Sequence, residues 1–456
     1  MDLSKLTKTE LLVKCTELGI GKCKSKTKPE LIILIQNKLS VNAEVTIINK
    51  GPSNIIIMND SKDESSISYK YIDLFCGIGG FHQALNKLGA KCVLACDIDK
   101  DCRVVYKDNY GIEPVNNVKE IDENQLEDFD IICGGFPCQA FSNGGKKKCF
   151  QDQRGLLFDE IIRIAKVKKP KFMFLENVKH ILKVSNGEVI EYIKNKIDSI
   201  GYHLQMFNIS PHNFGIPQQR ERVYFVCIRN DIYNGEDIVL PIYKGKLDFE
   251  KFLDKKEDID KKYFIKDDVL NVLEAWDKMV KQFKVGEKIS PTIMMNDAFK
   301  IYTQNEFNSL PDWKKDYIIK NRPLIQKYRK HFEEWYKIHS ELLQKREVYG
   351  KLEWQTGLIK ENDSIFNHFI QIRQSGIRVK KGCYFPTLVA ISQIPIYGKE
   401  KRYITPRECA RLQSFPESFK LPIDDKKSYK QLGNSVNVDN VYTVISTTLS
   451  KYGHSL

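Results

Sequence analysis

The side chains best suited to covalent and acid–base chemistry follow two neighbouring apolar runs of the sequence. Cys138 stands in a Gly-Gly-Phe-Pro-Cys-Gln loop after the run Asp130–Cys133, and Glu176 ends the next run, Phe172–Leu175. If both runs are strands of one open α/β sheet, the thiol and the carboxylate lie at the same sheet edge. We expect a thiol nucleophile beside a carboxylate. The alternatives are a small buried cysteine and a glutamate that caps a helix or lies in solvent.

Two arginines separated by one residue, Arg220 and Arg222, begin a further apolar run. Side chains at positions i and i+2 of a strand point to the same face of a sheet. Both guanidinium groups are therefore expected to converge on one target. A pair of surface arginines is the alternative.

A glycine-rich segment, residues 73–81, follows a predicted strand and opens a predicted helix. Glycines allow the backbone to approach a ligand closely at the start of a helix. Asp97 lies 20 residues after Gly77, where a carboxylate can accept hydrogen bonds from ribose hydroxyls. His82 stands where a dinucleotide motif has its third glycine. A nucleoside cofactor such as S-adenosylmethionine therefore fits better than a dinucleotide, and a tight structural turn is the alternative.

Residues from Tyr69 onward alternate strand-like and helix-like patterns that would bring these groups together. Such alternation predicts a doubly wound parallel sheet of the α/β, Rossmann-like class. The predicted strands are Tyr71–Phe75, Cys92–Ala95, Asp130–Cys133, Phe172–Leu175 and Arg222–Ile228, and the predicted helices include Gly80–Leu88 and Leu156–Val167. No Cys-x-x-Cys pair and no Cys/His cluster with zinc spacing occurs, so no metal is expected.

The first 40 residues predict a short helical module. Thr7 or Thr9 would cap a first helix, and Pro29 would open a second helix after a lysine-rich turn. The pattern resembles a SAP-type DNA-binding module, and an amphipathic hairpin that packs on the main domain is the alternative. The predicted domain boundaries are 1–40 for this module, 41–68 for a linker, 69–230 for a catalytic domain, 231–400 for a smaller irregular domain, and 401–456 for a segment that returns to the catalytic domain.

The composition limits the class of protein. The 456 residues are 42% hydrophobic and carry a net charge of +13. No apolar run approaches the roughly 18 residues that a membrane helix needs, so we expect no membrane association. A basic chain favours an anionic partner such as nucleic acid, although a general excess of lysine is the alternative. We expect an intracellular protein, in the cytoplasm of a prokaryote or of a virus-infected cell, or in a nucleus.

Six short motifs occur in the order found in DNA (cytosine-5) methyltransferases. They are Phe75-x-Gly-x-Gly-Gly, Pro137-Cys138-Gln139, Glu176-Asn177-Val178, Gln218-x-Arg220-x-Arg222, Arg407-Glu-x-Ala-Arg-Leu-Gln413 and Gly433-Asn434-Ser435-Val436. The chain is similar to this family over about residues 69–228 and again from 405 to 450. The combination is far more specific than any single motif.

The resemblance implies a role for each candidate catalytic residue. Cys138 would add to carbon 6 of cytosine, and Glu176 would hold ring nitrogen 3 and the exocyclic amine. Arg222, with Arg220 beside it, would clamp a cytosine flipped out of double-stranded DNA. Carbon 5 would then receive a methyl group from S-adenosylmethionine.

The resemblance also implies a cofactor pocket. Its residues would be Phe75, Gly77, Ile78, Gly79, Asp97, Ile98, Asn117, Gly135, Pro137, Leu157, Asn434, Ser435 and Val436. Asn117 is a departure, because the family often has an aspartate there to read the adenine amine. An amide oxygen can accept the same hydrogen bond.

The region between the arginine motif and Arg407 would select the DNA sequence. Its segment 371–381 is basic and loop-like, so Arg373, Arg378 and Lys380 are the predicted DNA contacts. The two arginines would read guanine or lie on phosphates. We expect a monomer. The alternatives are a tRNA methyltransferase, whose Cys-Phe-Thr signature is absent, an inactive DNA-binding scaffold and an NAD-dependent oxidoreductase. A restriction–modification partner, a viral enzyme and a regulatory enzyme would share these features.

Overall fold

The computed structural model divides the chain into two compact units, residues 1–66 and 67–456. It describes residues 7–17, 27–28, 30–32, 69–137, 156–389 and 393–453. Helix α1 (Lys8–Glu17) of the first unit begins after Thr7, whose hydroxyl accepts from the amide of Glu10, as predicted. The second predicted helix lies largely outside the described residues.

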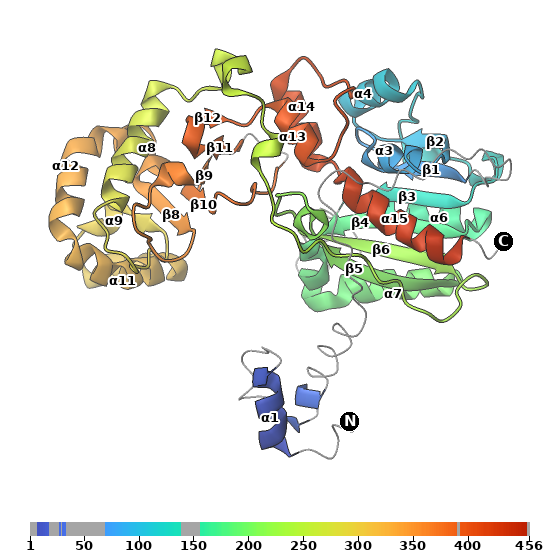
Figure 1. Cartoon of the computed structure of the whole chain (residues 1–456), viewed down its shortest axis with the longest axis horizontal. Coiled ribbons are helices and arrows are strands. Elements are labelled where there is room, and N and C mark those ends of the chain that lie inside the picture. The colour runs from blue at the N-terminus through green and yellow to red at the C-terminus, as the bar shows by residue number, and fades with distance from the viewer. Residues whose placement is uncertain are drawn as a thin grey trace. The chain divides into compact units, whose positions relative to one another are not determined.

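The first sheet of the second unit has six strands in the order β2-β1-β3-β4-β6-β5 (Figure 1). They are β1 (Lys70–Leu74), β2 (Lys91–Cys96), β3 (Ile131–Gly135), β4 (Phe172–Val178), β5 (Tyr202–Ile209) and β6 (Arg222–Arg229). Strands β1 to β4 are parallel, as predicted. The parallel direction was wrong for β6, which runs antiparallel to β4, and also to β5, a strand that the sequence did not predict. No α-helix lies between β5 and β6, and a parallel pair needs such a crossover.

Both faces of this sheet are covered by helices. On β4, Phe172 and Phe174 belong to one hydrophobic core, and Met173 and Leu175 belong to a second core on the opposite face. Helices α3 and α15 pack into the first core, and α6 and α7 pack into the second. The helices of this part are α3 (Gly80–Asn86), α4 (Lys100–Tyr110), α6 (Leu156–Lys168), α7 (Glu188–Ser199), α13 (Pro406–Leu412), α14 (Asp425–Asn434) and α15 (Val438–Tyr452). Polar groups are therefore left mainly to the ends of the strands.

A second six-stranded sheet, in the order β12-β11-β9-β10-β8-β7, fills the region that was expected to be irregular. Its strands are β7 (Ile293–Met294), β8 (Lys351–Gln355), β9 (Phe369–Arg373), β10 (Gly376–Lys380), β11 (Ile396–Tyr397) and β12 (Arg402–Tyr403). Beside it lie α8 (Asp267–Val280), α9 (Met295–Ala298), α11 (Asp312–Lys327) and α12 (Arg329–Lys345) (Figure 1), and α10 (Gln304–Ser309) joins α9 to α11 in the chain. Trp276 of α8 and Trp335 of α12 meet in its core with ring centroids 4.7 Å apart.

Segment 371–381 is a β-hairpin and not the loop that the sequence predicted. Strands β9 and β10 are antiparallel, with Arg373 opposite Gly376. Ile370 and Val379 point into the core of the second sheet, and their polar neighbours point away from it. The basic residues thus form the polar side of an alternating strand pattern. Because many of them lie close together in the sequence, this alternation is hard to recognise.

The two sheets share a packed junction. Phe369 of β9 contacts Phe385 and Phe249 in the core of the first sheet, with ring centroids 5.5 and 4.7 Å away. Arg402 of β12 donates to both carboxylate oxygens of Glu408 in α13, and both side chains are fully buried. Within the described residues, no helix is both long and apolar enough to cross a membrane.

Candidate active site

Glu176, which is buried, and Arg222, which is partly buried, form an ion pair near the end of β4. Tyr224 lies opposite Glu176 in the register of β4 and β6, so Arg222, two residues before Tyr224, is the diagonal neighbour of Glu176 on the same face. The Nε of Arg222 lies 3.0 Å from Oε1 of Glu176. Burial raises the pKa of Glu176, and the charges of Arg222 and Arg220 oppose this rise. The carboxyl group therefore keeps its proton to a higher pH than an exposed glutamate does.

Arg220 has different partners. Its guanidinium donates to the carbonyl of Leu388 at 2.8 Å and to those of Gly433 and Ser435 at 2.9 and 2.7 Å. The two arginines therefore do not converge on one target, contrary to the expectation from their spacing. Arg220 precedes β6, which begins at Arg222, so the strand rule does not apply to it.

The loop that leads to Cys138 begins beside Glu176. Cys138 itself lies outside the described residues. A Cβ on Gly135 would lie 3.4 Å from Oε2 of Glu176, so the end of β3 adjoins the carboxylate. Asn177 donates from Nδ2 to the carbonyl of Phe136 at 2.9 Å. This role of Asn177 was not predicted, although its place after Glu176 in the motif was the available signal.

The glycine-rich turn packs against a segment that is distant in the sequence. Gly79 has a φ of 84°, and a Cβ there would lie 2.3 Å from the ring of Tyr110. A Cβ on Gly80 would lie 2.5 Å from Cγ2 of Val436 and 2.9 Å from Oγ of Ser435. The predicted cofactor residues from the two ends of the second unit are thus adjacent. Gln413 supports this arrangement, since its Nε2 donates to the carbonyl of Leu432 at 2.8 Å.

Asp97 lies after β2 and holds the turn. Its carboxylate accepts the amides of Gly77 and Asp99, both at 2.8 Å. Burial raises the pKa of Asp97, and these hydrogen bonds partly oppose the rise. Ile98, next in the chain, is 77% exposed. A carboxylate beside an exposed apolar side chain suits a ribose and an adenine, so the residues present fit a nucleoside cofactor.

The other predicted cofactor residues come from several elements. The amide of Asp97 donates to the carbonyl of Val115 at 3.0 Å, which places the segment before Asn117 beside β2. The Oδ1 of Asn117 accepts the amide of Lys119 at 3.1 Å, so this oxygen is partly used in a local turn. The remaining members are Phe75 and Ile78 in the turn, Pro137 after β3, Leu157 in α6 and Asn434 at the end of α14.

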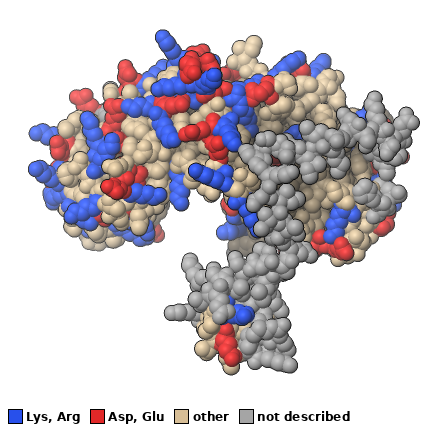
Figure 2. All heavy atoms as spheres, in the orientation of Figure 1, with Lys and Arg blue, Asp and Glu red and all other residues tan. Residues whose placement is uncertain are grey.

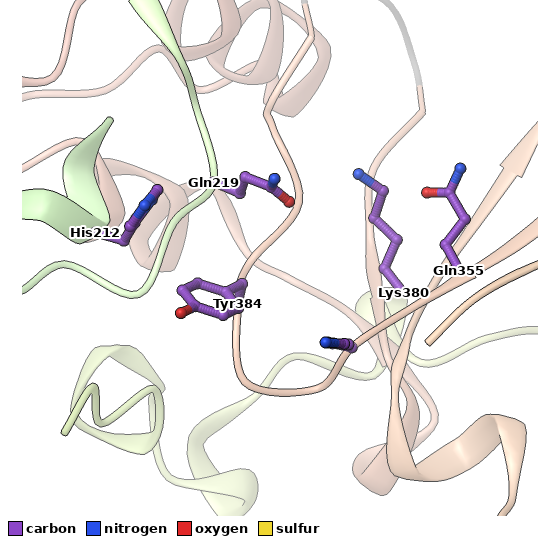
Figure 3. Close-up of a pocket in the computed structure, with 6 residues that line it drawn as sticks. His212, Gln219, Gln355, Lys380 and Tyr384 are labelled. Atoms are coloured by element: carbon purple, nitrogen blue, oxygen red, sulfur yellow. The ribbon is translucent and has the colours of Figure 1, made fainter. Parts of the chain in front are cut away.

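The predicted DNA contacts share one face of the β9–β10 hairpin. Arg378 donates from Nε to Oε2 of Glu353 at 2.6 Å. Arg373 donates to Oε1 of Gln371 at 3.0 Å. Lys380 lines a cavity together with Gln219, which neighbours Arg220 in the sequence (Figure 3).

An open α/β sheet with a glycine-rich turn and an acidic residue after its second strand defines a class of enzymes that bind nucleoside cofactors. Residues 69–450 match the C-5 cytosine-specific DNA methylases, and the chain belongs to this family. The predicted DNA cytosine-5 methyltransferase is thus confirmed over the tRNA-directed alternative. Residues 1–68 precede the matched region.

Individual relatives agree with the family assignment. The chain is 31% identical to the Type II methyltransferase M.HhaI of Haemophilus parahaemolyticus, over 84% of this chain and 94% of that protein. It is 32% identical to M1.ScrFI of Lactococcus lactis subsp. cremoris, over 85% and 80% of the two chains. Among solved structures, the methyltransferase EhMeth of Entamoeba histolytica shares the fold, with a TM-score of 0.50, 20% identity and coverage of 84% of this chain and 98% of that chain.

Proposed function

We propose that the protein methylates carbon 5 of a cytosine within a specific sequence of double-stranded DNA, with Cys138 as the nucleophile. The observation that carries this proposal is the ion pair of the buried Glu176 with Arg222, beside the loop that leads to Cys138. A base inside a duplex cannot reach such a site, so the target cytosine is flipped out at a cost of a few kcal/mol.

Glu176 activates the cytosine ring. Its raised pKa suits a protonated carboxyl group that donates to ring nitrogen 3, while its other oxygen accepts from the exocyclic amine. Arg222 holds the carboxyl group in place and lies near the charge that develops on the ring. Arg220 acts as a positioning residue, because its guanidinium is engaged by three backbone carbonyls.

Cys138 supplies the covalent step. Its thiolate adds to carbon 6, and the electron pair of the carbon 5–carbon 6 double bond moves toward carbon 5 and nitrogen 3. S-adenosylmethionine, when bound, supplies the methyl group that carbon 5 accepts. Loss of the carbon 5 proton to a base then restores the double bond and releases the Cys138 thiolate.

The cofactor is held by residues from both ends of the catalytic domain. Asp97 accepts from the ribose hydroxyls, and Ile98 packs against the adenine. Gly77 leaves room for close approach of the backbone to the cofactor, Gly79 makes room for the ring of Tyr110 behind the turn, and Val436 closes the pocket beside the glycine-rich turn. The other residues of the predicted pocket complete it, with Asn117 accepting from the adenine amine.

The partner is DNA, approached by the second sheet. Arg373, Arg378 and Lys380 contact it, and the enzyme acts as a monomer inside the cell. The relatives named above are Type II methyltransferases, which supports a role as the protective half of a restriction–modification pair.

The N-terminal unit adds a weak contact with DNA. Capping contacts occur at the starts of two segments of this unit. The side chains of Thr7 and Glu10 each accept the backbone amide of the other residue, and the carboxylate of Glu30 accepts from the amide and the hydroxyl of Thr27. Leu31 is fully buried, which supports a small packed module of the SAP type. Lysines between the two segments would lie on phosphates.

Transfer of a labelled methyl group from S-adenosylmethionine to duplex DNA, with tRNA in parallel and Cys138→Ala as control, tests this proposal. We expect label in 5-methylcytosine from DNA and none with the variant, which should still bind DNA. Label only in tRNA, or label that persists in the variant, would overturn the proposal.

A further inference from the structure

Strands β8, β9 and β10 present two chemically different faces. Side chains alternate along a strand, and one set here is packed in the core of the second sheet. The core set is Leu352, Trp354, Ile370, Ile372, Ile377 and Val379. The opposite set is Lys351, Glu353, Gln355, Phe369, Gln371, Arg373, Arg378 and Lys380, and its one apolar member, Phe369, packs into the core of the first sheet. This polar face carries four cations and one carboxylate.

The carboxylate of Glu353 connects two side chains of the polar face. Its Oε2 accepts from Nε of Arg378 at 2.6 Å, and these residues are partners in the register of β8 and β10. Its Oε1 accepts from Nε2 of Gln355. A carboxylate accepts only, so this contact fixes which end of the amide points away. Arg378 is left with its two terminal NH₂ groups, and Gln355 with its Oε1.

Lys380 lies beside Gln355, its partner in the register of the two strands. Both side chains line a cavity of about 370 Å³ and point the same way, with Gln219, His212 and Tyr384 across the cavity (Figure 3). Burial and the charges of Arg378 and Arg373 lower the pKa of Lys380. Its ammonium group contacts no carboxylate among the described residues. An ammonium donor and an amide acceptor therefore stand next to each other at this cavity.

The distribution of charge on the surface does not distinguish the polar face of β8–β10. Lys and Arg are interspersed with Asp and Glu over the side of the molecule seen in Figure 2, without a single continuous basic area among the described residues. The paired contacts of Glu353 distinguish the polar face from that mixed surface, because they fix the direction of the donors and the acceptor.

This arrangement matches the edges of bases better than it matches phosphate. Phosphate oxygens only accept hydrogen bonds, so Oε1 of Gln355 would face them unfavourably. In the major groove, guanine presents two acceptors, O6 and N7, and adenine presents the N6 donor beside the N7 acceptor. The two terminal donors of Arg378 complement guanine. The Lys380 donor and the Gln355 acceptor together complement adenine.

We propose that the polar face of β8–β10 reads a guanine through Arg378 and an adenine through Gln355 and Lys380, with Glu353 as the positioning residue that fixes both readings. The proposal rests on the proposed function, because it assumes that the substrate is duplex DNA. It adds which residues select the sequence and which bases they select.

The test is methylation of a duplex library in which the positions around the cytosine are randomised, followed by sequencing of the methylated products. We expect the wild-type motif to contain a guanine and an adenine. Arg378→Lys, which keeps the charge but loses the planar pair of donors, should lower the guanine preference roughly 10- to 100-fold, and Gln355→Ala should lower only the adenine preference. Glu353→Gln should weaken both preferences together.

Each outcome has a distinct meaning. A wild-type motif without guanine or adenine, or an unchanged motif in Arg378→Lys and Gln355→Ala, would overturn the inference and leave the proposed function intact. No methylation of any cytosine by the wild-type enzyme would overturn both. Glu347→Gln is the matched control. Glu347 is an exposed carboxylate just before β8 that pairs with Lys351, and its replacement should leave the motif unchanged. If Glu353→Gln fails to fold, the other two variants decide.

Discussion

The two sheets of the protein place their polar groups in opposite ways. Both faces of the first sheet are packed by helices, and Glu176 and Asp97 lie at or just beyond strand ends. The second sheet packs one face of β8–β10 into its own core, and the other face is polar except at Phe369, which packs into the core of the first sheet. A sheet covered on both sides offers polar groups mainly at its strand ends, whereas a sheet with one polar face can also offer side chains along its strands.

This difference extends to the electrostatics. Glu176 is buried beside two arginines, and its pKa is raised in spite of them. Glu353 of the second sheet is about one-fifth exposed and is paired with Arg378. The first sheet therefore holds a carboxyl group that can exchange a proton during a reaction. The second sheet holds a fixed ion pair, which suits the orientation of donors toward a partner.

Removing the carboxyl group at the edge of the first sheet should give the largest effect. We expect Glu176→Gln to lower the single-turnover methylation rate by about 10²- to 10⁴-fold, because the amide cannot give up a proton to the ring. Binding of DNA and of cofactor should change little. Glu221→Gln is the control, since that exposed glutamate pairs only with Lys179 in the described structure. A rate within threefold of wild type would show that Glu176 is not the acid.

The junction between the sheets gives the largest expected effect on stability. Glu408→Gln leaves the guanidinium of Arg402 buried with reduced compensation, which should cost about 3–5 kcal/mol of unfolding free energy. Urea unfolding measures this loss. Glu417→Gln, which affects an exposed partner of Arg411, should change stability little. Equal stability of the two variants would mean that the sheets are joined by their aromatic contacts alone.

The sequence predicted the first sheet far better than the second, and the reason is physical. Strands buried on both faces, such as β3 and β4, are continuous apolar runs that stand out in the sequence. Strand β5 was missed because it is an edge strand whose polar residues, including His203, Gln205 and Asn208, interrupt the apolar pattern.

The positions of site residues could be predicted where a sequence motif marks them. They could not be predicted where they depend on contacts between residues that are distant in the sequence. Asp97 and Glu176 followed from their places after strands. The partners of Arg220 come from residues 168 to 215 positions away, which no local pattern could reveal. The sequence predicts a loop for the β9–β10 hairpin, because its many charged residues make the alternation of apolar residues hard to recognise.

Cofactor binding tests whether the edge of the first sheet binds a nucleoside. Asp97→Asn should lower the affinity for S-adenosylmethionine roughly 10- to 100-fold, because a carboxylate accepts hydrogen bonds more strongly than an amide does. Titration calorimetry measures it. Asp101→Asn, at an exposed residue paired with Lys427, is the matched control. Equal affinities for the two variants would remove Asp97 from the ribose site.

The pH dependence of the rate sharpens the electrostatic contrast between the sheets. If protonated Glu176 is required, activity falls as pH rises through its raised pKa. Arg222 favours the charged carboxylate, so Arg222→Gln should raise this pKa further and move the alkaline limb of the rate profile to higher pH, although the maximum rate falls. A limb that stays in place would show that another group controls it. Arg378→Gln, in the second sheet, should leave the limb unchanged.

The smallest effect should come from the part of the chain that belongs to neither sheet. Deleting residues 1–40 should weaken DNA binding several-fold at low salt and less at high salt, because lysine–phosphate contacts release counterions. The single-turnover rate at saturating DNA should not change, since the family match begins at residue 69. DNA affinity measured against salt concentration separates the outcomes. A shallower salt dependence after deletion would assign phosphate contacts to this unit. An unchanged slope would leave DNA binding to the second unit, where the polar face of β8–β10 already provides four cations.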